Sequence, residues 1–198
     1  DRVFLSYCRA TGLKAHLVRY ADDFVILMRG GVKTTEQKVK QVLARMELKL
    51  NEEKSRVVDA REASFDFLGF AFCRRTNFKT GKGITLVEPS RKSEQQFRDE
   101  VRDMTSRKSH CVPQREVLDR VNRYVRGWVN YFHLHNSTRV FVRQRFFFEQ
   151  RMRKYLRGRR QIKGFGLSSW PASRLYKEFG LVAIPQHAQY RRTRTPLR

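Results

Sequence analysis

Two adjacent aspartates, Asp22 and Asp23, separate two short apolar stretches near the start of the chain. Residues 15–18 and residues 24–27 have the composition of β-strands, so the pattern predicts a hairpin with an acidic tip. Neighbouring side chains of a regular strand point to opposite faces, whereas a turn lets at least one aspartate reach a shared cation. Paired carboxylates suit Mg²⁺ where phosphate oxygens and water also bind it. The structural alternative is an acidic turn selected for its backbone preferences.

The charge of the chain favours a polyanionic partner. The 198 residues include 43 Lys and Arg against 19 Asp and Glu, which gives a formal net charge of +24. Nucleic acid is the usual partner of such a protein. An anionic membrane is the alternative, but no apolar run approaches the roughly 20 residues of a spanning helix, and the N-terminus carries no secretory signal. We therefore expect a protein that neither binds a membrane nor is secreted, and that is located in the cytoplasm or an organelle.

The cysteines and histidines give weak signals. Cys8, Cys73 and Cys111 are odd in number and far apart, which suits a reducing compartment without disulfides. Zinc binding by His110, Cys111 and the histidines near residue 134 is an alternative, but His110 and Cys111 are adjacent rather than separated by two to four residues. We expect ordinary surface and core roles for them.

The first half of the chain predicts a mixed α+β unit. Thr34 and Gln37 have the spacing of a capping box, and apolar residues at helical spacing follow over residues 34–50. A short strand is expected at residues 55–58. Aromatic residues alternate from Phe65 to Phe72, and the phase slips at Leu68-Gly69, which predicts a bulge or a close backbone approach. A turn at residues 80–83 and a strand at residues 84–87 complete this unit.

From Pro89 onward the pattern becomes helical. One helix is expected around residues 97–104, a second opens at Pro113, and a third covers about residues 138–157. The third contains Phe146-Phe147-Phe148, which predicts neighbours on two of its sides. The fold class is therefore α+β: a palm-like hairpin, helix and sheet followed by an α-helical bundle. The expected divisions are residues 1–88, residues 89–185 and a basic tail at residues 186–198, which orders only on RNA.

Three motifs resemble one known family. Tyr20-Ala21-Asp22-Asp23 matches the Tyr-x-Asp-Asp hairpin of reverse transcriptases, and residues 17–27 resemble the version found in group II intron reverse transcriptases, also called maturases. Residues 65–70 resemble the hairpin that supports the primer terminus in that family. Gly127-Trp128-Val129-Asn130-Tyr131-Phe132 resembles the signature of the maturase-specific, or X, domain. The three motifs occur in the family's order over about residues 15–170.

The resemblance implies an RNA-directed DNA polymerase and intron maturase that uses two Mg²⁺ ions, with RNA and a DNA primer or target as partners and a homodimer as a further expectation. It implies that Asp22 and Asp23 are catalytic metal ligands and that Tyr20, Ala21, Leu68 and Gly69 contact the primer or nucleotide. The family's first palm aspartate lies on an earlier strand, and nothing upstream of Leu17 matches it. We therefore expect a C-terminal portion that is inactive alone. The alternatives are a non-catalytic RNA-binding splicing cofactor and a retron-like reverse transcriptase.

A run of cations in the third expected helix indicates phosphate contact, because Glu149 is the only acid between Thr138 and Lys163. A solvated helix face normally mixes charges of both signs. The residues expected to bind RNA are Arg126, Arg139, Arg143, Arg145, Arg151, Arg153, Lys154, Arg157, Arg159 and Arg160.

Overall fold

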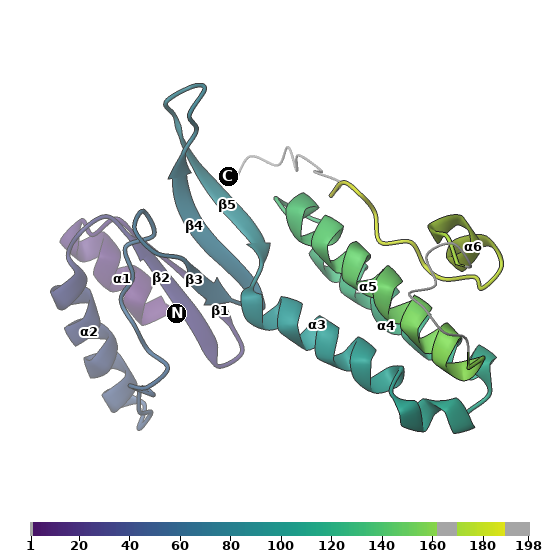
Figure 1. Ribbon diagram of the computed structural model, residues 1–198. Coiled ribbons are helices and arrows are strands. Elements are labelled where there is room, and N and C mark those ends of the chain that lie inside the picture. The colour runs from purple at the N-terminus through teal and green to yellow at the C-terminus, as the bar shows by residue number, and fades with distance from the viewer. Residues whose placement is uncertain (1, 162–169, 189–198) are drawn as a thin grey trace. The chain divides into compact units, whose positions relative to one another are not determined.

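The computed structural model describes residues 2–161 and 170–188. The chain divides into two compact units, residues 1–59 and residues 60–198 (Figure 1). The mixed architecture confirms the expected α+β class. The expected domain limits at residues 88 and 185 concern functional domains and stay predictions, and most of the expected basic tail lies outside the described residues.

The first unit packs two helices on one face of the expected hairpin. Strands β1 (Ala15–Tyr20) and β2 (Asp23–Met28) are antiparallel, and helices α1 (Arg2–Thr11) and α2 (Val32–Arg45) flank them in sequence. Phe4, Cys8 and Ala15 form the buried core, with Leu17 and Ile26 packed against it. These strand residues lie on one face because Leu17 pairs with Ile26. On the other face, Val18 and Leu27 are each 47% exposed.

Helix α2 differs from its predicted limits at both ends. It begins at Val32 after Gly31, whose φ is 68°, so the Thr34–Gln37 capping box does not form. The Thr35 hydroxyl donates to the Gly31 carbonyl instead. The helix ends at Arg45 rather than near residue 50, because Glu47 adopts a left-handed φ of 57°. The Glu47 and Leu48 amides donate to the carbonyls of Ala44 and Leu43, which is a Schellman motif. The strand predicted at residues 55–58 is absent from the structure, since no neighbouring strand pairs with it.

The second unit begins with a three-stranded antiparallel sheet. Its strands are β3 (Phe65–Phe67), β4 (Phe70–Thr76) and β5 (Gly83–Pro89), in that order. The sequence predicts two alternatives at Leu68-Gly69, a bulge or a close backbone approach. The bulge is wrong, because these residues form a two-residue turn, with φ values of 50° and 76°, that closes the β3–β4 hairpin. The close backbone approach is present, since the Gly69 carbonyl accepts from the Ser90 amide at 2.8 Å. The outer edge of β5 is also bonded, because Asn136 accepts from the Val87 amide and donates its own backbone amide to the Val87 carbonyl.

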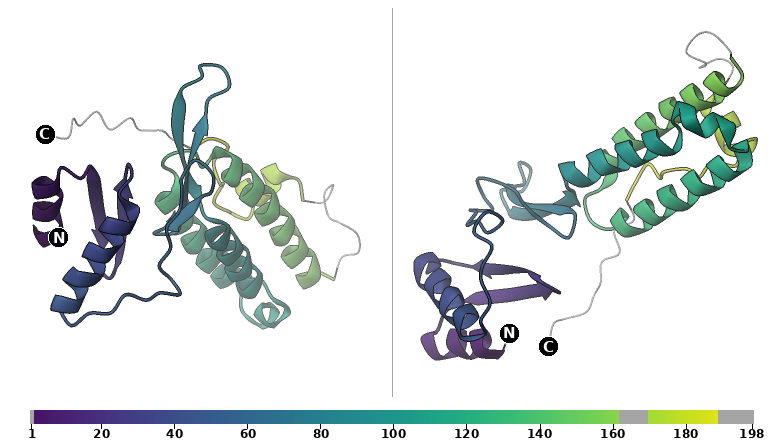
Figure 2. Two further views of the ribbon diagram at one scale, coloured as in Figure 1. Left: turned by 90° about the vertical axis from the view of Figure 1, so that its left-hand side faces the viewer. Right: turned by 90° about the horizontal axis from the view of Figure 1, so that it is seen from below.

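The helical part of this unit follows directly. It contains α3 (Arg91–Met104), the short 3₁₀ helix η1 (Arg107–Cys111), α4 (Gln114–Phe132), α5 (Thr138–Arg159) and α6 (Ala172–Lys177). The Ser90 hydroxyl caps α3 by accepting from the Ser93 amide, and Pro113 occupies the N-cap of α4. Figure 2 shows α3, α4 and α5 running side by side as a bundle.

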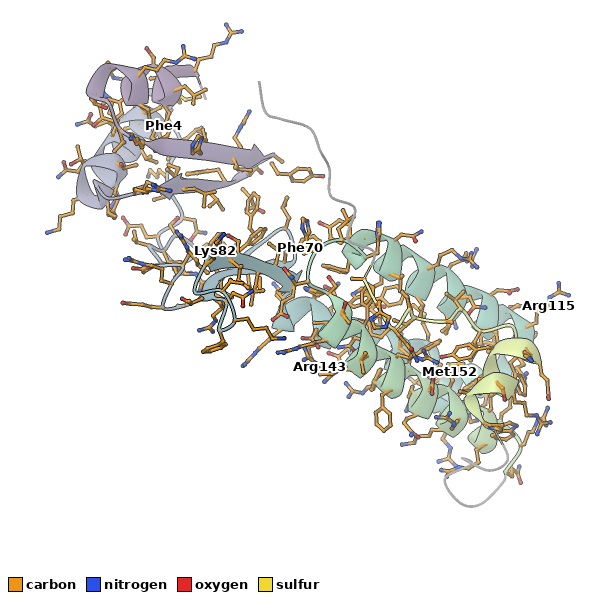
Figure 3. The ribbon with its side chains drawn as sticks, turned by 90° about the horizontal axis from the view of Figure 1, so that it is seen from above. Phe4, Phe70, Lys82, Arg115, Arg143 and Met152 are labelled. Atoms are coloured by element: carbon orange, nitrogen blue, oxygen red, sulfur yellow. The ribbon has the colours of Figure 1, made fainter. Side chains whose placement is uncertain are left out.

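The bundle core is aromatic and aliphatic, and it extends to the sheet. Its fully buried members include Phe97, Val121, Phe141, Phe148 and Met152, and Met152 is labelled in Figure 3. The expectation for the three consecutive phenylalanines holds only in part. Phe148 is buried and Phe147 lies under the α3 arginines, but Phe146 is 66% exposed.

Phe70 of β4 joins the sheet to the helices. Its ring packs edge-on against Phe132 with ring centroids 4.8 Å apart, and it also contacts Tyr131. Figure 3 shows Phe70 where the sheet meets the bundle. No helix in the described ranges is long and apolar enough to cross a bilayer.

The end of α2 generates a stability prediction. Because Glu47 adopts a left-handed conformation that costs an L-residue about 1 kcal/mol, Glu47→Gly should raise the free energy of unfolding by about 0.5–1 kcal/mol. Glu47→Ala removes the same charge and keeps the unfavourable φ, so it is the matched control and should give no gain. Denaturant unfolding of the chain measures both, and an equal gain for both variants would contradict the conformational explanation.

Candidate nucleic-acid interface

The tip of the first hairpin presents the expected acidic residues to solvent. Asp22 lies in the two-residue turn after Ala21, whose φ is 51°, and Asp23 begins β2 opposite Tyr20. Directly opposed residues share one face of a sheet, so Tyr20 and Asp23 lie on the face that α1 and α2 leave open. Tyr20 is 65% exposed, and both aspartates are exposed as well.

The tip supplies two hard oxygen ligands and no more. Among the described residues there is no group of three or more His, Cys, Asp or Glu side chains that could hold a metal ion. Asp22 and Asp23 fit a partial Mg²⁺ site, since Mg²⁺ accepts one or two protein carboxylates together with water and phosphate oxygens. A two-metal centre needs further ligands, and these two residues do not complete one.

The second and third sequence motifs meet in one groove of the second unit. The Leu68-Gly69 turn lies against the start of α3 and the last turns of α4. The Leu68 carbonyl accepts from the Tyr131 hydroxyl at 2.9 Å, and the Gly69 carbonyl accepts from the Ser90 amide and the Ser93 hydroxyl, both at 2.8 Å. The groove has a volume of about 510 Å³ and is lined by Leu68, Gly69, Ser93, Gln96, Arg123, Tyr124, Gly127, Trp128, Tyr131 and Phe132.

Only glycine fits the turn that closes this groove. Gly69 has a φ of 76°, and a Cβ there would lie 3.0 Å from the Ser93 hydroxyl and 3.4 Å from the Phe132 ring. Leu68 precedes it with a φ of 50°, a conformation in which such turns normally use Asn, Asp or Gly. A leucine in a strained turn of this kind is typical of functional sites. At the edge of the groove the turn therefore combines a position that favours glycine with a leucine in an unfavourable left-handed conformation.

The chemistry of the groove is aromatic, with an arginine at its edge. Burial, assisted by the charge of Glu100, raises the pKa of Tyr124 to about 12, so its phenol stays a neutral donor at physiological pH. The buried indole Nε1 of Trp128 has no hydrogen-bond partner in the described structure. Arg123 is exposed at the edge, and nothing lies within 4 Å of the side-chain position of Gly127. Such a surface can accept flat rings and a phosphate.

A second hollow has the opposite charge. It lies along α3, has a volume of about 690 Å³, and is lined by Lys92, Gln95, Gln96, Asp99, Glu100 and Asp103. Three carboxylates against one lysine disfavour a polyanion here. The outer face of α3 is therefore unsuited to phosphate contact.

Arg153 departs from its expected role. Its exposure is 5%, its Nε donates to the Trp170 carbonyl at 2.8 Å, and its Nη2 pairs with Glu149 at 3.3 Å. Burial acts to raise the pKa of Glu149, but hydrogen bonds from Tyr176 and Arg145 outweigh it and lower that pKa. RNA contact does not fit such a position, because the guanidinium is already enclosed and bonded. Arg153 pairs with Glu149 four residues earlier on α5. Its bond to the Trp170 carbonyl joins α5 to the segment before α6.

Three further candidates join α5 to the preceding helices. Arg143 pairs with Glu94 of α3 at 2.8 Å, and Figure 3 labels Arg143 on α5. Arg151 donates to the hydroxyl and carbonyl of Thr105. Arg159 donates to the Val112 carbonyl at 2.7 Å, beside the end of η1. Arg145 is paired within α5 with Glu149 at 3.0 Å. The first three contacts link α5 to the rest of the bundle. In all four arginines, part of the guanidinium is already bonded and therefore less available to phosphates.

The remaining candidates are exposed or half-exposed. Three of them are exposed, namely Arg126 of α4 and Arg139 and Lys154 of α5, whereas Arg157 is half-buried. Arg160 is exposed but lies over the rings of Trp170 and Phe179, 5.7 and 5.8 Å from their centroids. Arg126, Arg139 and Lys154 are the expected residues whose charge is most accessible to RNA.

Sequence reasoning missed two cationic positions in the second unit. Arg123 lines the groove from α4, just before the motif whose aromatic residues carry the resemblance. The far end of the β4–β5 hairpin carries Arg74, Arg75, Lys79 and Lys82, all exposed. A signal for the hairpin was present in the sequence, since no acid occurs between Asp66 and Glu88.

The second unit is thus a predominantly helical domain with an aromatic groove and a basic surface. Residues 94–176 match the family model described as the group II intron, maturase-specific domain. The matched region, less than half of the chain, includes Gly127–Phe132 and confirms the resemblance that this motif predicted. No curated protein was found to match the chain.

The buried pair on α5 generates a prediction that separates structure from binding. Arg153→Gln should lower the free energy of unfolding by about 1–3 kcal/mol, because it removes the guanidinium that donates to the Trp170 carbonyl and leaves Glu149 with Arg145 and Tyr176 alone. Arg126→Gln removes an exposed cation of the same type and should stay within about 0.5 kcal/mol of the wild type. Thermal or denaturant unfolding decides, and a mild effect of Arg153→Gln would contradict its structural role.

Proposed function

We propose that this chain binds group II intron RNA through its maturase-specific domain and belongs to a reverse transcriptase that assists intron splicing. The match of residues 94–176 to the maturase-specific domain carries the proposal. The +24 net charge supports RNA as the partner independently of the family. The meeting of the Leu68-Gly69 turn with the Tyr131 end of α4 adds support, because two motifs 63 residues apart line one groove.

Reverse transcription is the finer part of the proposal, and the first hairpin supports it. Two Mg²⁺ ions in such an enzyme activate the primer 3′-hydroxyl and stabilise the leaving pyrophosphate. Asp22 and Asp23 would hold metal from the exposed tip, and Tyr20, on the same face as Asp23, would pack beside the primer or nucleotide. Ala21, in the same turn with a φ of 51°, would contact the primer or nucleotide, and Leu68 and Gly69 would support the primer terminus from their own turn.

The open face of the β1–β2 sheet is consistent with a larger palm. A two-stranded sheet is marginal by itself, and this one exposes Val18 and Leu27. A further strand at its edge could add the missing carboxylate. The DNA primer, a homodimer and the cellular compartment stay predictions.

A non-catalytic splicing cofactor is the second candidate. It is favoured by two observations: the family match lies wholly in the helical part, and the described residues provide only the paired carboxylates of the tip. Both candidates require RNA binding, and only the first requires metal-dependent nucleotide transfer.

RNA binding by the chain should depend steeply on salt, since each phosphate contact releases counterions. Replacing Arg126, Arg139 and Lys154 together by Gln should weaken binding to a structured intron RNA at low salt. It should also reduce the slope of log K against log salt by roughly one for each phosphate that no longer meets a cation. Filter binding across a salt series measures both. Lys40→Gln is the control, because Lys40 pairs with Glu36 in the first unit. A flat salt response of the wild type would overturn the proposal.

Nucleotide transfer should be absent from the chain alone, because two carboxylates on one turn do not hold both metals in place. Given primer, template, Mg²⁺ and nucleotides, the wild type should extend no more primer than Asp22→Asn. Asp22→Asn should leave RNA affinity unchanged or slightly higher, since it removes a negative charge. Template-dependent extension above the Asp22→Asn background would show that the chain needs no further palm carboxylate or obtains one from another copy.

A further inference from the structure

The far end of the β4–β5 hairpin is an arm without a core. Residues 74–76 and 83–85 are exposed on both strands, although Arg74 pairs with Thr85 and Thr76 with Gly83 in regular register. At its base the Arg74 amide donates to the Ala60 carbonyl at 2.6 Å, but the exposed residues beyond give it no hydrophobic face. A two-stranded ribbon of this kind is marginal in water. Figure 1 shows this hairpin extending away from the start of α3 within the second unit. We call residues 74–85 the arm.

One aromatic residue, Phe78, is exposed to solvent at the tip of the arm. Phe78 is fully exposed, with a relative accessibility of 104%. The loop around it is braced by Asn77, whose side chain accepts from the Lys79 amide at 2.9 Å and whose carbonyl accepts from the Gly81 amide at 2.8 Å. The loop closes through the Asn77 amide, which donates to the Lys82 carbonyl. Because these bonds satisfy the backbone, Phe78 projects from a defined turn.

The charge around Phe78 has a single sign. The arm carries Arg74, Arg75, Lys79 and Lys82 and no acid, and Figure 3 labels Lys82 on this hairpin. Arg74 and Arg75 are neighbours on one strand, so they point to opposite faces of the ribbon. The arm thus presents cations on both faces and an aromatic ring at its end.

Protection against edge-to-edge aggregation is the simplest other explanation for lysines on a bare hairpin. It accounts for the charges but not for Phe78, since an exposed phenylalanine at the tip works against solubility. An aromatic ring between cations matches a single-stranded nucleic acid, where bases stack on the ring and phosphates meet the charges. In RNA, unpaired bases in loops and bulges are the ones accessible for such stacking, because the A-form major groove is too narrow to enter.

We propose that the arm binds unpaired nucleotides of a structured RNA, with Phe78 stacking on a base and Lys79 and Lys82 contacting the flanking phosphates. The proposal rests on the proposed function for RNA as the partner and adds a surface that lies outside residues 94–176. It also assigns a chemical preference, for bulged over fully paired RNA, that a purely electrostatic surface lacks.

The test compares two RNA stems that differ only in a bulge of three unpaired adenines. Fluorescence anisotropy should give Phe78→Leu a roughly five- to hundredfold weaker affinity for the bulged stem and little change for the paired stem. Phe78→Leu keeps an apolar side chain without a ring, and Phe78→Tyr should restore the wild-type preference. Because Phe78 is fully exposed, neither variant should alter thermal unfolding. Lys79→Gln with Lys82→Gln should weaken both stems and reduce the salt slope.

The outcomes separate the arm from the domain. Unchanged affinity of Phe78→Leu for the bulged stem overturns the arm proposal, and salt-dependent binding of both stems by the wild type would then leave the RNA-binding function standing. Failure of the wild type to bind either stem or the intron RNA overturns both. Equal weakening by Phe78→Leu and Phe78→Tyr also overturns the stacking role.

Discussion

The Leu68-Gly69 turn is the contact on which the second unit depends. Its two carbonyls accept hydrogen bonds from both sides: Gly69 from Ser90 and Ser93 at the start of α3, and Leu68 from Tyr131 near the end of α4. Phe70, directly after the turn, adds ring contacts to Tyr131 and Phe132. One tight turn thereby fixes the sheet against two helices and forms the edge of the aromatic groove. Its unfavourable leucine conformation is held by these surrounding contacts.

The arginines of α5 divide into two functional groups. Those that meet carboxylates or carbonyl groups of α3, η1 and the segment before α6 act within the bundle, as Arg143, Arg153 and Arg159 do. Guanidinium groups suit this task because their fixed donors can bond several acceptors at once. Arg139 and Lys154 remain on the outside. A helix that looks uniformly basic in sequence therefore holds the fold on one side and offers charge on the other.

The two units carry different parts of the proposed activity. The first presents paired carboxylates on an exposed tip and has an open sheet face. Such an arrangement suits a metal site whose remaining ligands come from another strand. The second contains residues 94–176, which match the maturase-specific domain, together with the aromatic groove and the basic arm. Binding surfaces made from local helices and hairpins are self-contained, whereas a two-metal site needs ligands from several strands. RNA binding and nucleotide transfer thus make separate demands on the chain.

The sequence by itself determined the α+β class, the acid-tipped hairpin, the three long helices and the maturase-specific motif, because periodicity, turn residues and local spacing specify these features. It misplaced the ends of α2, where Gly31 and Glu47 adopt left-handed conformations. At Leu68-Gly69 it left a bulge and a close backbone approach as alternatives, and the structure has a turn with the close approach. Only the tertiary structure decided which arginines are paired within the bundle, since the partners of Arg143 and Arg159 lie about fifty residues away in sequence. The tertiary structure also decided that Leu68 contacts Tyr131 and that Phe78 is fully exposed. Burial depends on which distant segments pack on a residue and not on its neighbours in the sequence.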